Sequence, residues 1–173
     1  EGCDIFANKY DGVGISQGGD PTVRDCKIHD GKDCGVIVVE QGKGTIEGCD
    51  IFANKYDGVG IKQGGDPTVR DCKIHDSKEG VGVLVFEQGK GTIESCDIFA
   101  NKLAGVGIRQ GGNPTIRGCK IHDCKEGNGV LVREQGKGTI EGCDIVADEC
   151  AGVAIQQGGD PTVRYCKIHD SKD

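Results

Sequence analysis

The chain of 173 residues has few large apolar side chains: three tyrosines, four phenylalanines, and neither methionine nor tryptophan. Such side chains fill most of an ordinary globular core, so a different regular arrangement has to bury the apolar surface of this chain. No apolar run approaches the length that crosses a bilayer, and no signal peptide opens the sequence. We therefore expect a single domain over residues 1–173, without a membrane partner.

Positive charge is also scarce relative to negative charge. Charged residues make up 28% of the chain, and the acidic ones prevail to give a net charge of −7. Proteins that bind nucleic acid neutralise phosphates with an excess of Lys and Arg, so this balance argues against a nucleic-acid partner.

Glycine is abundant, with 31 residues, and the sequence repeats itself. Residues 1–30 and 47–76 differ at one position only, Ser16 against Lys62. Within these long units lies a shorter one of 23 or 24 residues, marked by Thr22, Thr45, Thr68, Thr92, Thr115, Thr139 and Thr162. Each short unit alternates apolar and polar residues between glycine-rich turns and shows no helical period. This pattern predicts an all-β coil of parallel strands, a β-solenoid with about 23 residues per coil and seven to eight coils.

Stacking of the short units places equivalent residues in columns. Four columns are aliphatic and are expected to form the core; one of them is Ile5, Ile28, Ile51, Ile74, Ile98, Ile121, Ile145 and Ile168. A further inward column, here called the cysteine ladder, is Cys3, Cys26, Cys49, Cys72, Cys96, Cys119, Cys143 and Cys166. Stacked side chains point in parallel, which is poor geometry for a disulfide, so we expect buried reduced thiols and a cytoplasmic location.

Outward columns alternate in the sign of their charge. One such column is Glu1, Arg24, Glu47, Arg70, Glu94, Arg117, Glu141 and Arg164, and a second runs from Asp4 and Lys27 to Asp144 and Lys167. A column of like charges would repel itself along its length, whereas alternation fixes which coil lies above which. The charges are therefore interpreted mainly as determinants of register.

Histidines recur at every second coil, at His29, His75, His122 and His169. Ligands of one zinc ion must lie much closer together than the spacing of about 9.6 Å between alternate coils. Phenylalanines fill three of the alternate positions, so an outward stack of aromatic and imidazole rings is expected. The cysteines outside the ladder lack a metal-binding spacing, and neither a metal nor another cofactor is predicted.

The stretches NPTIRGCKIHD, GVLVREQGKGTIEGCDIFAN and GVGIKQGGDPTVRDCKIHD resemble right-handed parallel β-helix repeats of the CASH type, as found in bacterial β-helix proteins and in the central domain of F-box protein eleven. The resemblance covers essentially the whole chain. It implies a right-handed parallel β-helix over residues 1–173, taken as a fragment or idealised array without dedicated caps. Function does not follow from such a fold, because the same solenoid hosts lyases, hydrolases, adhesins and protein-binding scaffolds.

The residues favour one function and leave one alternative open. An outward apolar strip could grip an extended peptide or a partner protein, and its expected binding residues are Ile37, Val39, Leu84, Phe86 and Leu131. The preferred interpretation is a noncatalytic protein-interaction scaffold, with head-to-tail stacking of copies through the solenoid ends. The alternative is a carbohydrate-binding or polysaccharide-active domain, although Lys73 between Asp50 and Asp97 disfavours that pair of carboxylates as catalytic acid and base.

Overall fold

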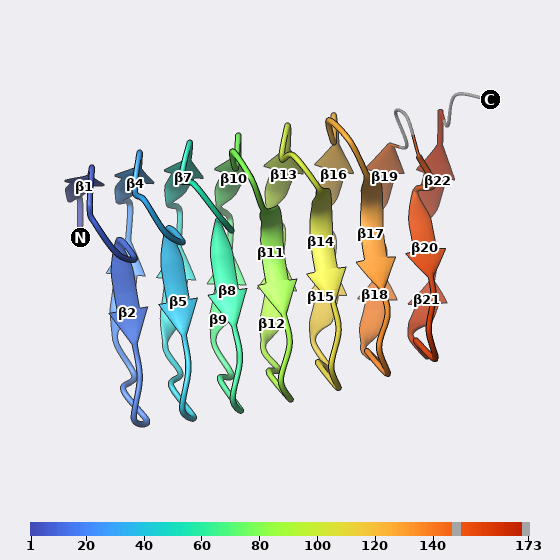
Figure 1. Ribbon diagram of the computed structural model, residues 1–173, viewed down its shortest axis with the longest axis horizontal. Helices are drawn as coiled ribbons and strands as arrows, with labels where there is room; N and C mark the ends of the chain where they lie inside the picture. Colours follow the sequence, from blue (N-terminus) through green and yellow to red (C-terminus); the bar gives the residue numbers. More distant parts are fainter. Residues whose placement is uncertain (147–149, 171–173) are drawn as a thin grey trace.

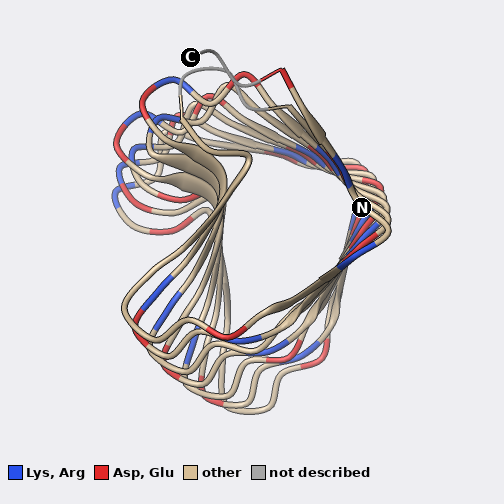
Figure 2. Ribbon diagram, turned by 90° about the vertical axis from the view of Figure 1, so that its right-hand side faces the viewer, with Lys and Arg blue, Asp and Glu red and all other residues tan. Residues whose placement is uncertain are grey.

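The structure is a computed structural model that describes residues 1–146 and 150–170. These residues form 22 short strands joined by turns, with no helix among them. Successive strands pass through three parallel sheets, here named A, B and C, and each coil contributes one strand to each sheet. Figure 1 shows the coils side by side along the long axis, and Figure 2 shows the three walls around one interior. The predicted all-β, right-handed parallel solenoid of about 23 residues per coil is confirmed.

Sheet A contains eight strands. They are β1 (Asp4–Phe6), β4 (Lys27–His29), β7 (Asp50–Phe52), β10 (Lys73–His75), β13 (Asp97–Phe99), β16 (Lys120–His122), β19 (Asp144–Val146) and β22 (Lys167–His169). Sheet B contains seven strands, three of them longer than the others. They are β2 (Val13–Ile15), β5 (Val36–Val38), β8 (Val59–Ile61), β11 (Val81–Val85), β14 (Ala104–Ile108), β17 (Asn128–Val132) and β20 (Val153–Ile155).

Sheet C also contains seven strands. They are β3 (Thr22–Arg24), β6 (Thr45–Glu47), β9 (Thr68–Arg70), β12 (Thr92–Glu94), β15 (Thr115–Arg117), β18 (Thr139–Glu141) and β21 (Thr162–Arg164). Sheet A thus extends one strand beyond the other two sheets at the C-terminal end.

The predicted head-to-tail stacking of copies through the solenoid ends remains a prediction. No helix in the described part of the chain is long and apolar enough to cross a membrane.

The core is formed by the aliphatic columns that the repeat predicts. Ile51 pairs in register with Ile28 below it and Ile74 above it, and all three side chains are fully buried. Val59 and Val83 form the same kind of contact in sheet B. Aliphatic side chains fill the interior between the three sheets, which explains how the chain folds with so few aromatic residues.

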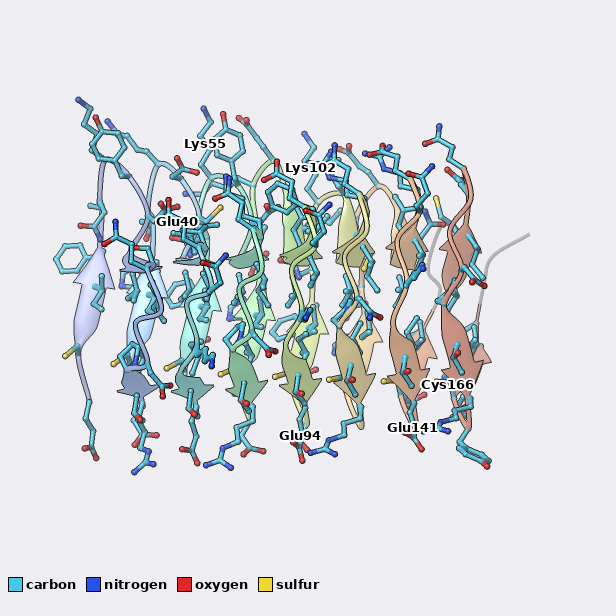
Figure 3. The ribbon with its side chains drawn as sticks, turned by 90° about the horizontal axis from the view of Figure 1, so that it is seen from below. Glu40, Lys55, Glu94, Lys102, Glu141 and Cys166 are labelled. Atoms are coloured by element: carbon cyan, nitrogen blue, oxygen red, sulfur yellow. The ribbon has the colours of Figure 1, made fainter. Side chains whose placement is uncertain are left out.

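The cysteine ladder lies inside the solenoid, as predicted, and its eight members are thiols rather than disulfides. Figure 3 shows their sulfur atoms as a row across successive coils, ending at the labelled Cys166. Contacts with the Cys119 and Cys72 thiols, together with burial, raise the pKa of Cys96. The neighbouring Cys72 Sγ donates to Arg70 O at 3.2 Å and to Ile46 O at 3.6 Å. Two carbonyl oxygens favour S–H over a thiolate, so the ladder is neutral.

The alternating charges form ion pairs between coils in sheet C. Glu47 is contacted by Arg24 at 3.0 Å and by Arg70 at 3.1 Å, from the coils on either side. The pKa of Glu47 is lowered, first by its hydrogen bond with Arg70 and then by that with Arg24. Figure 2 shows the alternation of blue and red from coil to coil. The interpretation of these charges as determinants of register is consistent with this pairing.

The histidines stack with phenylalanines on the outer face of sheet A, as predicted. The His29 ring lies 4.6 Å from the Phe52 ring, centre to centre, with the planes 8° apart. The sequence did not reveal that both imidazole nitrogens also meet carboxylates. His29 Nδ1 lies 2.9 Å from Asp30 Oδ2, and His29 Nε2 lies 2.9 Å from Asp4 Oδ1. These contacts give the histidines a structural role.

Buried asparagines tie together the turns that lead from sheet A to sheet B. Asn54 accepts a hydrogen bond from Gly31 N at 3.0 Å and donates one to Ile28 O at 3.0 Å. Asn101 makes the equivalent bonds two coils further on. Each amide satisfies two backbone groups that would otherwise be buried without a partner, and so holds adjacent turns in place.

Candidate functional site: a groove on sheet B

A groove of about 660 Å³ lies over the outer face of sheet B. Its floor is apolar and consists of Ile37, Leu84, Gly107 and Leu131, from strands β5, β11, β14 and β17. The strands expose these residues because successive side chains of a strand point to opposite faces, and their neighbours fill the core. The groove volume falls in the range of small-molecule and oligomer-binding clefts.

The floor is smoother than the sequence suggests, because large side chains lean over the glycines of the next coil. A Cβ atom at Gly60 would lie 2.7 Å from Ile37 Cδ1, and a Cβ atom at Gly107 would lie 3.0 Å from Leu84 Cδ1. The glycines therefore make room for the isoleucine and leucine of the neighbouring coil. The result is a continuous apolar surface in place of a strip with gaps.

One wall of the groove is basic. Lys62, Arg109 and Arg133 follow strands β8, β14 and β17 directly in the sequence. Phe86 lies between the first two, with its ring centre 5.4 Å from Lys62 Nζ and 5.2 Å from Arg109 Cζ. Both distances are within the range of cation–π contacts, so the ring helps to position the two cations.

The opposite wall is acidic and is built from the turns between sheets A and B. It carries Asp11, Asp33, Asp57 and Glu79, with Tyr56 and Leu103 exposed on the same side. The coil that contains Glu79 is one residue longer than its predecessor, since Val83 pairs with Val59 whereas His75 pairs with Phe52. The extra residue therefore falls in the turn that lines the groove.

Asp57 is the acidic residue whose environment is most altered. Burial raises its pKa to about 6, although the Val81 N–H and the charge of Arg109 act in the opposite direction. The Val81 N–H donates to Asp57 Oδ1 at 3.0 Å, which fixes the carboxyl group at the groove wall. A carboxyl group that titrates near neutral pH can both accept and donate a proton, which is the property required of a general acid or base.

Asp11, Asp33 and Cys34 offer three potential metal ligand atoms within 4.8 Å of one another. One oxygen of each carboxylate already accepts a hydrogen bond from the backbone, because Cys34 N donates to Asp11 Oδ1 at 3.2 Å and to Asp33 Oδ1 at 3.0 Å. Burial and the charge of Asp57 raise the pKa of the Cys34 thiol, so its sulfur keeps its proton. The two carboxylates therefore stabilise the turn through hydrogen bonds, and the three potential ligand atoms are poorly suited to binding a cation.

Four of the five binding residues expected from the sequence line this groove: Ile37, Leu84, Phe86 and Leu131. Val39 does not line the groove. It occupies the position equivalent to Lys62 in the preceding coil. Sequence reasoning missed Lys62, Arg109, Arg133 and Asp57. One signal was present, because Lys62 is the only difference between residues 47–76 and residues 1–30.

The carboxylates of Asp50 and Asp97 are not part of the groove. Lys73 pairs in register with Asp50 on one side and Asp97 on the other, as expected. All three residues lie on the outer face of sheet A, where the two carboxylates contact His75 and His122.

Comparison with solved structures shows which proteins share this architecture. The A-modules of mannuronan C-5 epimerases AlgE6 and AlgE4 from Azotobacter vinelandii match with TM-scores of 0.71 and 0.67 and identities of 17% and 14%. The matches cover 98% and 97% of this chain, and 55% and 52% of the epimerase chains. Pectate lyase Pel9A matches with a TM-score of 0.62 and 16% identity, over 98% of this chain and 51% of the lyase. This chain thus spans about half the length of these structures.

These matches correct one expectation. The sequence analysis favoured a noncatalytic scaffold, because of the apolar strip and because Lys73 lies between Asp50 and Asp97. The three solved structures named above share the fold over nearly the whole chain and are two epimerases and a lyase, and this finding contradicts the prediction of a noncatalytic protein. The physical reason lies in the turns, where a single inserted residue and a few substitutions are enough to build a groove with titratable walls.

No curated protein sequence matches the chain. The family profile described as "Right handed beta helix region" matches residues 1–81 and 77–173, which together include every residue. The three parallel sheets and the coil length agree with that description. The chain therefore belongs to the right-handed β-helix family.

Proposed function

We propose that the protein is a polysaccharide-active β-helix domain that binds an acidic polysaccharide in the groove on sheet B. The observation that carries this proposal is the arrangement of the groove walls, with Lys62, Arg109 and Arg133 facing Asp57 across an apolar floor. A sugar ring has apolar faces that suit such a floor, and a uronate carboxylate suits a row of cations. The matches to mannuronan epimerases and a pectate lyase support the same substrate class.

The proposed chemistry is proton transfer at the carbon next to the uronate carboxylate. Lys62 and Arg109 would pair with that carboxylate and stabilise the negative charge that develops on it when the C–H bond breaks. Asp57 in its ionised form would accept the proton. Return of a proton to the other face of the carbon would give epimerisation, and departure of the neighbouring glycosidic oxygen with a proton would give a shortened chain with a double bond.

The test is incubation of the protein with polymannuronate and with polygalacturonate in deuterated water. Nuclear magnetic resonance would show deuterium at the carbon next to the carboxylate, and ultraviolet absorbance would show any new double bond. The Asp57→Asn variant should lose this exchange while still binding the polymer, since asparagine can accept the Val81 N–H. Arg70→Gln on sheet C should exchange as the unaltered protein does. Exchange that survives in Asp57→Asn, or no exchange with any acidic polymer, would refute this chemistry.

A second function is favoured by the apolar floor itself. Ile37, Leu84 and Leu131 line the groove from alternate strands, with Gly60 and Gly107 between them, and this spacing suits the alternate side chains of an extended peptide. The resemblance to CASH-type repeats, including those of F-box protein eleven, belongs with this second proposal of a protein or peptide partner. The Leu84→Asp variant separates the two functions, because it should abolish binding of an apolar peptide, whereas Lys62→Ser should leave that binding intact and weaken binding of an acidic polysaccharide.

A further inference from the structure

The cysteine ladder has no part in the proposed function, yet it gathers eight thiols into one column. Six of its members, from Cys26 to Cys143, are between 1% and 3% exposed. Cys3 is exposed and Cys166 is partly exposed, so the column opens at both ends of the described coils. Among the residues that the structure describes, no other buried column carries a reactive group at every coil.

The thiols are direct vertical neighbours. Lys73 N donates to Cys49 O at 2.9 Å and Asp97 N donates to Cys72 O at 2.9 Å, so the backbone at each cysteine is hydrogen-bonded to the next coil. The Cys96 thiol interacts with the thiols of Cys72 and Cys119. Strands in a sheet are about 4.8 Å apart, and this spacing sets the separation of the sulfur atoms along the axis.

This separation matches a linear sulfur–metal–sulfur unit. Two metal–thiolate bonds of about 2.3 Å each span about 4.6 Å. The side chains stand roughly perpendicular to the sheet, so an ion midway between two sulfurs meets each of them along the solenoid axis. A zinc ion would need four ligands in a tetrahedron, and the column places the next sulfur a whole coil away.

Charge selects among the soft cations that accept two thiolates. A divalent ion that binds two sulfurs displaces two S–H protons, and the resulting unit is neutral. A monovalent copper or silver ion would leave one negative charge on each pair of sulfurs, which an aliphatic interior disfavours. We infer that the cysteine ladder is a binding site for soft divalent cations that prefer linear coordination by two thiolates, with mercuric ion as the probe and one ion for every two neighbouring thiols.

Two variants with equal numbers of thiols test this inference. Both carry Cys34→Ala, Cys124→Ala and Cys150→Ala. The alternating variant adds Cys26→Ala, Cys72→Ala, Cys119→Ala and Cys166→Ala, which leaves four ladder thiols that are two coils apart. The contiguous variant instead adds Cys3→Ala, Cys26→Ala, Cys49→Ala and Cys72→Ala, which leaves four that are vertical neighbours. Circular dichroism checks that each variant keeps its β-structure.

Each reduced protein is titrated with mercuric ion in competition with glutathione. We expect the contiguous variant to hold two ions and to bind them about 100-fold more tightly than the alternating variant, because only it presents two thiols to one ion. X-ray absorption of the unaltered protein should show two sulfur neighbours in a linear arrangement. Equal affinity of the two variants would overturn the inference. So would a sulfur count of three or four in the unaltered protein, which decides the matter even where a variant fails to fold.

Discussion

The ring of Phe86 lies 5.4 Å from Lys62 Nζ, and Arg109 from the coil on its other side approaches the same ring to 5.2 Å. Two like charges are thereby held on either side of one aromatic residue at the edge of the groove. The ring faces attract both cations and restrict where they can move. This arrangement links a packing contact to the proposed recognition of acidic polymers.

Phe86→Leu should weaken binding of polygalacturonate by about 1 kcal/mol, because leucine keeps the apolar contact and loses the attraction for both cations. Isothermal titration calorimetry measures the change. Phe52→Leu, in the stack on sheet A, is the matched control and should leave polymer binding unchanged. Equal weakening by the two substitutions would show that general destabilisation, rather than the position of the cations, is responsible.

The pKa of Asp57 predicts a pH dependence of stability. Burial raises this pKa to about 6, above its value in the unfolded chain, so the folded state binds the proton more tightly. Stability should therefore fall as the pH rises from about 4 to 6, by at most about 3 kcal/mol because the groove admits solvent to the carboxyl group. Urea unfolding at a series of pH values measures this slope.

Asp57→Asn should flatten the slope and stabilise the protein at pH 7. Asparagine can accept the Val81 N–H just as Asn128 accepts the Ala151 N–H at 3.1 Å. An unchanged slope in the variant would show that another group is responsible.

The histidines give a separate pH effect. The pKa of His29 is raised above its usual value, first by the hydrogen bond with Asp30 and also by Asp4. The pKa of His169 is raised first by Asp144 and then by Asp170. The stability that these contacts add is fully present below the unfolded pKa of about 6.5 and is lost as the pH rises through the higher folded value.

His29→Gln should reduce the loss of stability that occurs as the pH rises above about 6.5, the usual pKa of histidine in an unfolded chain. The His29 resonances, followed by nuclear magnetic resonance, should titrate above the usual value. A titration at or below that value would contradict the role of the two carboxylates.

Ser77 has a buried hydroxyl oxygen without a hydrogen-bond partner among the described residues. It occupies the column of Asn54 and Asn101, whose amides bridge successive turns. Ser77→Asn should therefore stabilise the protein by about 1 kcal/mol, since the new amide can bridge the turns as its neighbours do. Thermal unfolding tests this, with Ser77→Ala as a control that removes the hydroxyl without adding an amide. Equal stability of Ser77→Asn and Ser77→Ala would refute the predicted bridge.

The repeat predicted the core, the register and the pairing of charges, because Ile51, Cys49 and Glu47 occupy positions where every coil has an equivalent residue. It did not predict the groove. The walls depend on turns whose residues vary from coil to coil. Asp57, for example, occupies the position that Cys34 fills in the preceding coil and Val81 in the following one. The buried amides of Asn54 and Asn101 were missed for the same reason, since glycine and serine occupy neighbouring positions. How far a turn rises above the sheet depends on three-dimensional packing, which the order of residues in a column does not specify.

The proposal that the groove binds acidic polysaccharides is tested most directly by comparing two polymers. These are polygalacturonate and its fully methyl-esterified form, which has the same backbone without charge. The unaltered protein should bind the acidic form, and the Lys62→Ser, Arg109→Gln double variant should bind it at least about tenfold more weakly, as expected when two charge-assisted contacts are lost. Equal affinity for the acidic and esterified polymers, or undiminished binding by the double variant, would contradict the assignment of this groove to acidic polysaccharides.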